Sequence, residues 1–380
     1  MGIPTSNRAR WTAVLAIELE SELEMVEADT MAVTIFGTLP DGSEIREARL
    51  ATASGCEARI LELGATLRDL IVPLHGGAVQ RVVLGFETLE TYDGRSHHAG
   101  AIVGRNANRI AHGRFSLDGV SYQLALNEKG KHSLHSGPDG FGRRSWRIVE
   151  HAADQVTLAF FSPAGDQGFP GALALWCRYQ LRDPATLALE LIATTDAATI
   201  VNLAHHPYFN LDASEDARDH DLMITADFVT PTDRELIPTG EIVSVAGTPY
   251  DFRAMRPVRH VPSGTAKAFG YDTNFVLRRA GVAGASGQAF AHSATLASAR
   301  NGLALELWTS APGLQLFDGH DMAFPAPGLG GRRYGEGAGI ALEAQHFPDS
   351  PNHAHFPSTV LRPGEIWRQR TEYRFHPIQR

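Results

Sequence analysis

The stretch TLALELIAT at residues 186–194 alternates leucines with other residues at a period of two. Successive side chains of a β-strand point to opposite faces, so its three leucines are expected to share one buried face. The stretch LALELWT at 303–309 repeats the pattern, directly after Asn301-Gly302, a dipeptide typical of two-residue hairpin turns. The sequence therefore predicts half-buried strands joined by hairpins.

Residues 367–375 extend this pattern to the end of the chain. Apolar, aromatic or uncharged residues from Trp367 to Phe375 alternate with Arg368, Arg370, Glu372 and Arg374, which predicts a strand that closes a sheet facing water. Thirty-seven glycines and twenty-one prolines punctuate short apolar runs, and helical periodicity is scarce. This favours an all-β fold, a large antiparallel β-sandwich with long functional loops, over a doubly wound parallel sheet.

Composition narrows the class of protein further. The chain has 380 residues, 43% of them hydrophobic, which is enough to build the core of one large domain or two ordinary ones. The net charge of -9 argues against nucleic acid as a partner, and no apolar run is long enough for a membrane span or a signal peptide. Cys56 and Cys177 lie far apart, which predicts buried thiols in a cytoplasmic protein rather than disulfides or a zinc site.

The chain is expected to form an appendage over residues 1–30 and a single β-sandwich domain over 31–380. The appendage holds the one amphipathic helical pattern of length, at 13–28, ahead of a strand signal at 32–36. Whether Met31 is the natural first residue stays open from the sequence.

Two patterns imitate other kinds of site. The glycines at 335, 337 and 339 fail the dinucleotide fingerprint, because Ile340 takes the last glycine position and a strand pattern follows. His353 and His355, with His346, have metal-ligand spacing, but nearby prolines indicate a loop, so no metal is expected. His97-His98 is interpreted as loop surface.

Four polar clusters interrupt apolar strand patterns: GRNANRI (104–110), SLHSG (133–137), VNLAHHPYFNL (201–211) and IALEAQH (340–346). In the first cluster, Asn108 and Arg109 offer amide and guanidinium donors suited to hydroxyl-rich ligands. In the last, a period of two places Glu343 opposite Leu342 and Ala344. This carboxylate must therefore face solvent or a cleft.

The motifs GRNANRI, SLHSG, HHPYFNL (205–211), YDTNF (271–275), PGLQ (312–315) and LEAQHFPDSPNH (342–353) occur in this order. Together they resemble the aldose 1-epimerase (galactose mutarotase) family over about residues 31–377. The resemblance implies a galactose mutarotase-like supersandwich with an open substrate cleft. It also implies a cofactor-free isomerase that interconverts the α and β anomers of free sugars such as galactose and glucose, with a monosaccharide as its partner.

The resemblance assigns roles to seven residues. It places the general acid at His206 and the general base at Glu343, with Asn108, Arg109, His135, Asp272 and Gln315 around the sugar. The chemistry agrees, because a cyclic hemiacetal opens when a base takes the anomeric hydroxyl proton while an acid protonates the ring oxygen. A glutamate with its ordinary pKa of about 4.3 is expected to be ionised at neutral pH.

Two departures from the family pattern bear on acidity and on the choice of sugar. The family commonly has Thr-Asn-His where this chain has Ala204-His205-His206, so a second histidine adjoins the expected acid. After Gln315, the family's aromatic pair and Thr-Gly-Asn are replaced by LFDGH at 316–320. The preferred sugar is therefore open.

Two other functions are weighed against the epimerase. One is a non-catalytic carbohydrate-binding module, because a fold does not fix function. The other is an epimerase for phosphorylated sugars, which should have a cluster of arginines at its cleft, and Arg105, Arg109 and Arg114 could be misread as such a cluster. Pentoses also remain candidate substrates, and the chain is expected to be a monomer or homodimer.

Overall fold

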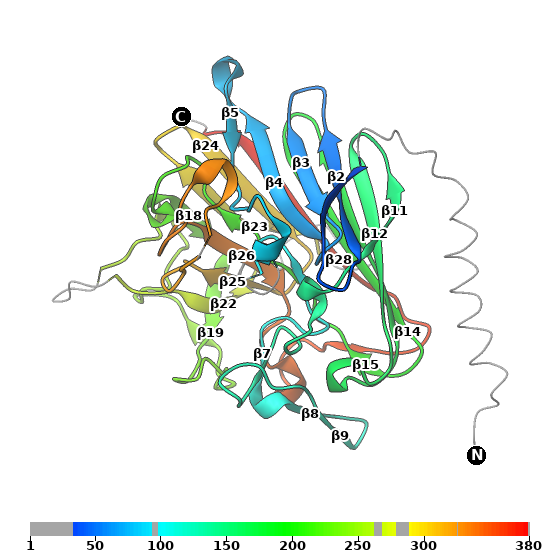
Figure 1. The fold of residues 1–380 in the computed structure, drawn as a ribbon. Coiled ribbons are helices and arrows are strands. Elements are labelled where there is room, and N and C mark those ends of the chain that lie inside the picture. The colour runs from blue at the N-terminus through cyan, green and yellow to red at the C-terminus, as the bar shows by residue number, and fades with distance from the viewer. Residues whose placement is uncertain (1–32, 93–97, 262–267, 279–288, 325, 379–380) are drawn as a thin grey trace.

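The computed structural model describes residues 33–92, 98–261, 268–278, 289–324 and 326–378. The expected helix at 13–28 and the question of Met31 lie outside the described residues. Within them the chain is built almost wholly from strands (Figure 1), and every named strand pairing is antiparallel. The prediction of an all-β, antiparallel fold is confirmed.

The largest sheet holds nine strands. In spatial order they are β11 (Arg147–His151), β12 (Gln155–Ser162), β13 (Leu173–Arg182), β14 (Thr186–Thr195), β28 (Trp367–Pro377), β24 (Leu303–Thr309), β23 (Ala291–Ser298), β18 (Asp221–Ile224) and β21 (Arg256–Pro257).

A second sheet carries most of the residues discussed below. Its six strands are, in order, β17 (Tyr208–Phe209), β26 (Ile340–Gln345), β25 (Gly313–Phe317), β22 (Asp272–Leu277), β19 (Ala226–Thr230) and β20 (Val243–Ser244). A third sheet runs in chain order through β1 (Val33–Thr38), β2 (Glu44–Ala51), β3 (Glu57–Leu61), β4 (Thr66–Pro73) and β5 (Val79–Arg81).

Short strand pairs and turns make up the connecting segments. The pairs are β6 (Ile102–Val103) with β16 (Ala204–His205), β7 (Arg109–Ile110) with β10 (Ser133–Leu134), β8 (Arg114–Leu117) with β9 (Val120–Gln123), and β15 (Thr199–Ile200) with β27 (Val360–Leu361). One short α-helix, α2 (Leu89–Tyr92), and 3-10 turns such as η4 (Phe141–Arg143) and η8 (Ser350–Asn352) accompany them in the described part of the chain.

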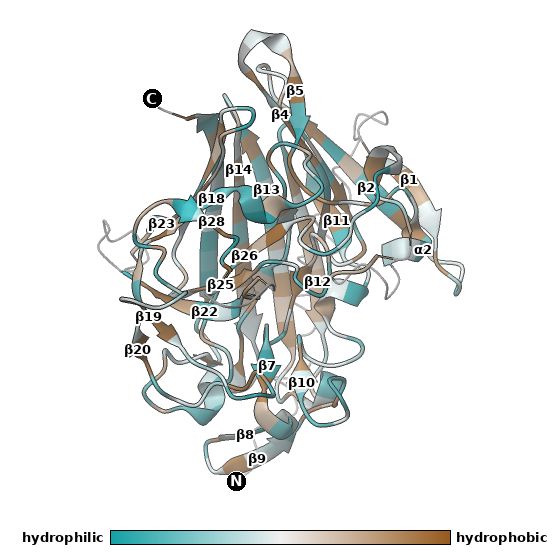
Figure 2. Cartoon of the chain, turned by 90° about the vertical axis from the view of Figure 1, so that its left-hand side faces the viewer, coloured by the Kyte–Doolittle hydropathy of each residue, from teal (hydrophilic) through white to brown (hydrophobic). Residues whose placement is uncertain are grey.

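The main hydrophobic core joins all three sheets. It takes Leu187 and Leu305 from the nine-stranded sheet, Leu314 and Leu342 from the six-stranded sheet, and Ile60 from the five-stranded sheet. All five side chains are fully buried. The strands change between hydrophilic and hydrophobic residues along their length (Figure 2), as expected when one face packs inward.

The hairpin at Asn301-Gly302 is confirmed, but its turn is longer than predicted. Strand β23 ends at Ser298 and pairs there with Leu303, so four residues make the connection instead of two. The amide of Gly302, which has a φ of 71°, donates to the carbonyl of Ser298. The positive φ explains why glycine suits this position.

The last strand does not close a sheet as predicted. Strand β28 lies in the interior of the nine-stranded sheet, between β14 and β24. Its alternation is as expected, since Tyr373 and Phe375 are buried while Arg368 and Arg370 are exposed. Alternating polar and apolar residues indicate which face of a strand is buried. They do not indicate which strands lie on either side of it in the sheet.

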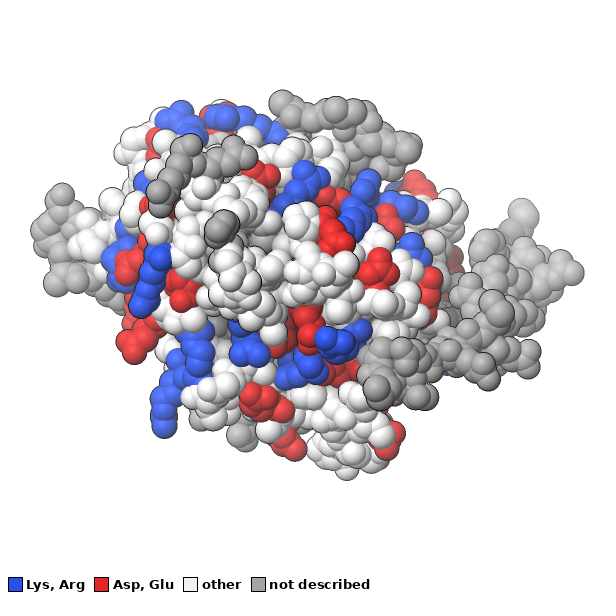
Figure 3. Space-filling model, turned by 90° about the horizontal axis from the view of Figure 1, so that it is seen from above, with Lys and Arg blue, Asp and Glu red and all other residues white. Residues whose placement is uncertain are grey.

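The surface carries both signs of charge. Basic and acidic side chains are interspersed on the face seen from above (Figure 3). Among the described residues, no helix is long and apolar enough to cross a membrane.

Candidate active site

The six-stranded sheet has one apolar face and one polar face at its centre. Register pairs Asn274 with Gln315 and Gln315 with Glu343, so these three side chains form one row across β22, β25 and β26. The next row contains Asp272 and Phe317. The other face supplies core leucines such as Leu314 and Leu342. Every residue of β26 is buried, so the polar face of this strand is covered as well as its apolar face.

His206 meets Glu343 above this polar row. Its Nε2 lies 3.5 Å from Oε1 of Glu343, and the two residues are only 6% and 2% exposed. The backbone fixes the histidine, because the amide of His206 donates to the carbonyl of Ala101 and its carbonyl accepts from the amide of Gly100. A histidine and a carboxylate are thus held together in a largely dry environment.

His135 stands beside His206, with their ring centroids 5.6 Å apart. Asn108 and His135 both adopt left-handed backbone conformations, with φ of 59° and 49°. In this arrangement the amide of Asn108 donates to Nδ1 of His135 at 3.1 Å. Because Nδ1 accepts, the hydrogen of the neutral ring sits on Nε2, which makes that atom a donor.

Burial keeps His135 neutral. Its pKa lies well below the ordinary value, first because burial disfavours the charged ring and then because His98, His206 and Arg109 are nearby positive or protonatable groups. His135 is therefore suited to donating a hydrogen bond from Nε2 rather than to transferring a proton as imidazolium.

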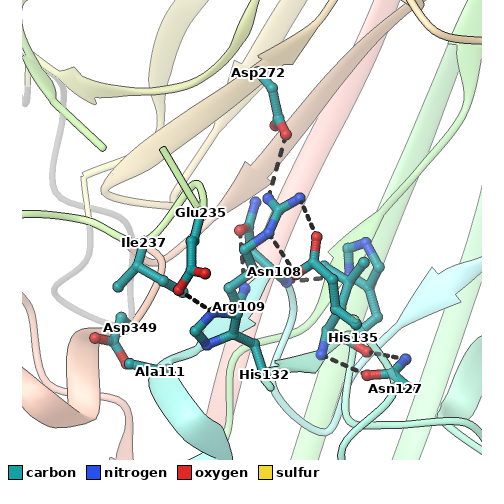
Figure 4. Close-up of polar contacts among 12 residues, drawn as sticks. Asn108, Arg109, Ala111, Asn127, His132, His135, Glu235, Ile237, Asp272 and Asp349 are labelled. Atoms are coloured by element: carbon teal, nitrogen blue, oxygen red, sulfur yellow. Dashed lines mark hydrogen bonds and ion pairs between the residues drawn. The ribbon is translucent and has the colours of Figure 1, made fainter. Parts of the chain in front are cut away.

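Arg109 links the loops to the sheet. Its Nε and Nη2 donate to the two carboxylate oxygens of Glu128 at 2.8 and 2.9 Å, and its Nη1 donates to Asp272 at 3.2 Å. Figure 4 shows the Arg109 side chain reaching Asp272 from the region of Asn108 and His135. The other oxygen of Asp272 accepts from Nε2 of Gln315 at 2.5 Å. Four side chains thus form one connected network.

The pKa of Glu343 differs from the sequence expectation. Burial raises it well above the ordinary value, the negative charge of Asp272 raises it further, and Arg109 opposes the shift. The expectation of an ordinary pKa was therefore wrong, because period two shows which face a carboxylate takes but not how deeply that face is covered. A raised pKa makes the ionised carboxylate a stronger base.

Several polar atoms at this site are buried without a hydrogen-bond partner in the described part of the chain. They are Oε2 of Glu343, Oε1 of Gln315, Oδ1 of Asn274 and both polar atoms of the Gln345 amide. Buried polar atoms are normally satisfied, so clustered exceptions indicate a place for a polar ligand or water. A hydroxyl-rich molecule would supply the missing donors and acceptors.

A metal is a less fitting ligand for the same cluster. His135, His206 and Glu343 bring ligand atoms within 4.8 Å of one another. However, Nδ1 of His135 already accepts a hydrogen bond and Nε2 then carries the hydrogen, so neither nitrogen offers a free lone pair. The cluster is arranged for hydrogen bonding and proton transfer.

The other histidines with metal-ligand spacing lie in the loop around η8, as the sequence predicts. His355 contacts the carbonyl of Gly240 at 2.7 Å, and His353 lies 3.4 Å from Asp349. The glycines at 335, 337 and 339 also lie in a loop, where the amide of Gly337 donates to the carbonyl of Gly319.

Two residues near the site were missed or misread from the sequence. His98, interpreted as loop surface, is only partly exposed, and its ring lies 5.0 Å from that of His135 and 6.3 Å from that of His206. Glu128, which holds Arg109, has no motif of its own. Its position in a loop 19 residues after Arg109 gives no pattern from which the pairing could be read.

His205, the neighbour of His206 in the sequence, points to the core. Nδ1 of His205 lies 3.1 Å from the hydroxyl of Tyr373, and its ring packs against Tyr179 and Tyr373. Burial lowers the pKa of His205 to about 3, with His206 contributing. His205 is therefore neutral at ordinary pH and adds no second positive charge beside His206.

The structure brings all seven predicted site residues into one place. His206 meets Glu343, Asn108 holds His135, and Arg109 and Gln315 hold Asp272. Fold and site together define a class: a β-sandwich protein with a buried imidazole and carboxylate pair, beside polar groups suited to a polyhydroxylated ligand.

The comparisons with known proteins name the family. Residues 46–374 match the family model described as aldose 1-epimerase. The chain is 38% identical to the aldose 1-epimerase of Escherichia coli over 88% of this chain and 96% of that protein. It is 37% identical to human galactose mutarotase over 90% of this chain and 97% of that protein. The chain belongs to the aldose 1-epimerase family, as the motifs indicate.

Solved structures agree. The aldose epimerase homologue from C. elegans superposes with a TM-score of 0.81 at 31% identity and covers 88% of this chain and 99% of its own. The galactose 1-epimerase from Lactobacillus acidophilus superposes with a TM-score of 0.74 at 26% identity, and the match covers 91% of this chain and 98% of that one. The predicted mutarotase-like sandwich is thereby confirmed.

Proposed function

We propose that the protein interconverts the α and β anomers of free aldohexoses such as galactose and glucose, with Glu343 as general base and His206 as general acid. The observation that carries the proposal is the 3.5 Å approach of His206 Nε2 to Oε1 of Glu343 in a buried setting. The anomeric hydroxyl and the ring oxygen are bonded to the same carbon. An acid and a base this close can therefore reach both oxygens of one hemiacetal.

In the reaction, Glu343 takes the proton of the anomeric hydroxyl while His206 gives its proton to the ring oxygen. The bond between the anomeric carbon and the ring oxygen breaks, and an open-chain aldehyde forms. After rotation about the first carbon-carbon bond, the hydroxyl re-attacks the other face of the carbonyl. It returns its proton to His206, and Glu343 reprotonates the anomeric oxygen, so both residues regain their starting states.

The remaining hydroxyls need a firm grip while the anomeric carbon rotates. Asp272 is held by Arg109 on one oxygen and by Gln315 on the other, which fixes it as an acceptor for sugar hydroxyls. Nε2 of His135 supplies a donor, since its Nδ1 is engaged by Asn108. These contacts support sugar binding by the five residues Asn108, Arg109, His135, Asp272 and Gln315.

The three arginines that could suggest a phosphorylated substrate are engaged elsewhere. Arg105 is buried and donates to the carbonyls of Pro170 and Gly171, while Arg114 is exposed and donates to Gln123. Arg109 already pairs with two carboxylates. The geometry thus favours a neutral sugar over a sugar phosphate.

A cytoplasmic location and a monomeric or homodimeric state are also proposed. Free, buried Cys56 and Cys177 support a reducing compartment. Light scattering of the purified chain checks the oligomeric state.

Polarimetry of freshly dissolved α-glucose and α-galactose tests the function directly. The wild type should speed the approach to anomeric equilibrium, and it should prefer glucose to glucose 6-phosphate. His206→Asn should lower kcat by about 10²–10⁴, because it removes the group that gives its proton to the ring oxygen. Tight sugar binding without acceleration would favour the non-catalytic binding module instead, and a preference for glucose 6-phosphate would overturn the choice of substrate class.

A further inference from the structure

The segment Asp318-Gly319-His320 follows β25 directly and has no part in the proton transfers proposed above. Asp318 is fully buried, and its Oδ1 lies 2.7 Å from Nδ1 of His320. The Asp318 amide donates to the carbonyl of Tyr271, and Gly319 turns the chain with a φ of 68°. A buried carboxylate thus fixes a histidine whose side chain is 31% exposed.

The register of the six-stranded sheet relates this histidine to the site. Along β25, Gln315 lies in the row of Glu343, and Phe317 lies in the next row, opposite Asp272. The ring of His320 packs edge-on against Phe317, with centroids 5.5 Å apart. Counted from Glu343, His320 therefore lies beyond the row of Asp272.

Aromatic contacts give the same order. His206 packs against Tyr208 with centroids 5.0 Å apart, Tyr208 against Phe317 at 6.1 Å, and Phe317 against His320. This series of ring contacts begins at His206, beside Glu343, and ends at His320. A pyranose with its anomeric carbon at His206 and Glu343 that points its opposite ring carbon, the fourth, toward Phe317 would direct the hydroxyl on that carbon to the end of the site where His320 lies.

The surroundings of His320 favour its protonated form. Its hydrogen bond to Asp318 raises the pKa of the imidazole, and the charges of Asp321 and Asp272 add to the effect, while burial opposes it. Nδ1 is oriented by Asp318, so Nε2 is the ring nitrogen left for a ligand, and it is an N–H donor whenever the ring is protonated.

We infer that His320, oriented by Asp318, is a specificity-determining residue that donates a hydrogen bond to the hydroxyl on the fourth carbon of the sugar. The inference rests on the proposed function and deepens it. Galactose and glucose differ only in the configuration of this carbon. His320 would therefore set the relative affinity for the two sugars, without taking part in proton transfer.

The test measures KM and kcat by polarimetry for galactose, glucose and 4-deoxyglucose, with the wild type, His320→Ala and His320→Asn. His320→Ala should raise KM about tenfold for the better of the two hexoses, change the galactose to glucose preference, and leave kcat within about twofold. With 4-deoxyglucose, which lacks the hydroxyl, the wild type and His320→Ala should have equal KM. His320→Asn, which keeps a donor, should lie between them.

A matched control is available at His376, which is 33% exposed and pairs with Glu306 at 3.4 Å on the nine-stranded sheet. His376→Ala removes a similar histidine and carboxylate pair and should leave all three KM values unchanged.

The KM of the wild type should also rise as pH increases and His320 loses its proton, whereas His320→Ala should lack this rise. The inference would be overturned if the wild type and His320→Ala had the same preference between galactose and glucose. It would also be overturned if their KM values differed as much on 4-deoxyglucose as on the two hexoses. If the wild type accelerates no aldose at all, the proposed function fails instead.

Discussion

Replacing Glu343 by glutamine should abolish most activity and at the same time stabilise the protein. A positioned general base contributes about 10²–10⁴ in rate, which is about 2.7–5.4 kcal/mol of barrier, so kcat should fall by this factor. Glutamine keeps the size of the side chain and cannot accept the anomeric proton. The assay is polarimetry of freshly dissolved α-galactose, with KM measured to show that binding persists.

The stability gain follows from the burial of Glu343. Its pKa is raised in the folded state, so ionising it as pH increases through that pKa removes folding free energy that is present in acid. Oε2 also lacks a partner among the described residues. Glutamine removes the charge, and we expect about 1–3 kcal/mol of added stability at alkaline pH, where imidazole side chains are neutral and the ionised Glu343 has no cation paired with it in the described part of the chain. Urea unfolding measures this gain, and the difference should be smaller at acid pH.

Glu372→Gln is the matched control. Glu372 is also a buried strand carboxylate, but it pairs with Arg374 and Arg182 on the other large sheet. Its replacement should leave activity unchanged and should not stabilise the protein. A Glu343→Gln enzyme that turns over at the rate of the wild type would refute the assignment of the base, and one that is less stable than the wild type at alkaline pH would refute the reasoning about buried charge.

Two further variants test the neighbours of the acid and base. Glu128→Gln should raise the KM for galactose about tenfold, because Arg109 loses its charged bidentate partner and holds Asp272 less firmly. Because Arg109 lowers the pKa of Glu343 and would be less neutralised, the acid limb of kcat should move to lower pH; Glu235→Gln, which lies outside this network, should move neither quantity. His205 has a pKa of about 3 in the folded protein, below its ordinary value of 6.5, so its stabilising effect is present above pH 6.5 and is lost as pH falls towards 3. Between pH 7 and pH 5 the wild type should lose about 2 kcal/mol more unfolding free energy than His205→Asn, and parallel pH curves in urea unfolding would contradict this.

The sequence predicts strands well where one face is packed and the other is wet. The leucines of β14 and β24 are buried as their alternation requires. Such a pattern records only the environment of each face. It therefore does not predict that β28 lies between β14 and β24, nor that the hairpin at Asn301-Gly302 has four connecting residues.

The sequence predicts the residues of the candidate site that lie in motifs, and it does not predict those that reach the site only through contacts made by the folded loops. Asp272 and Arg109 were expected near the sugar, although 163 residues separate them. Glu128 and His98 lie in loops with no periodicity. Their contacts with Arg109 and His135 depend on how those loops fold over the sheet, which no local pattern encodes.

The pKa of Glu343 shows most clearly what a linear pattern leaves out. Alternation along β26 separates Glu343 from Leu342 and Ala344, and this is equally consistent with a wet face and a covered one. In the structure every residue of β26 is buried, because the loops that carry His135 and His206 cover the polar face while the core covers the other. The same covering that removes water from the carboxylate brings it to the histidine. Basicity and proximity at this site therefore have one structural cause.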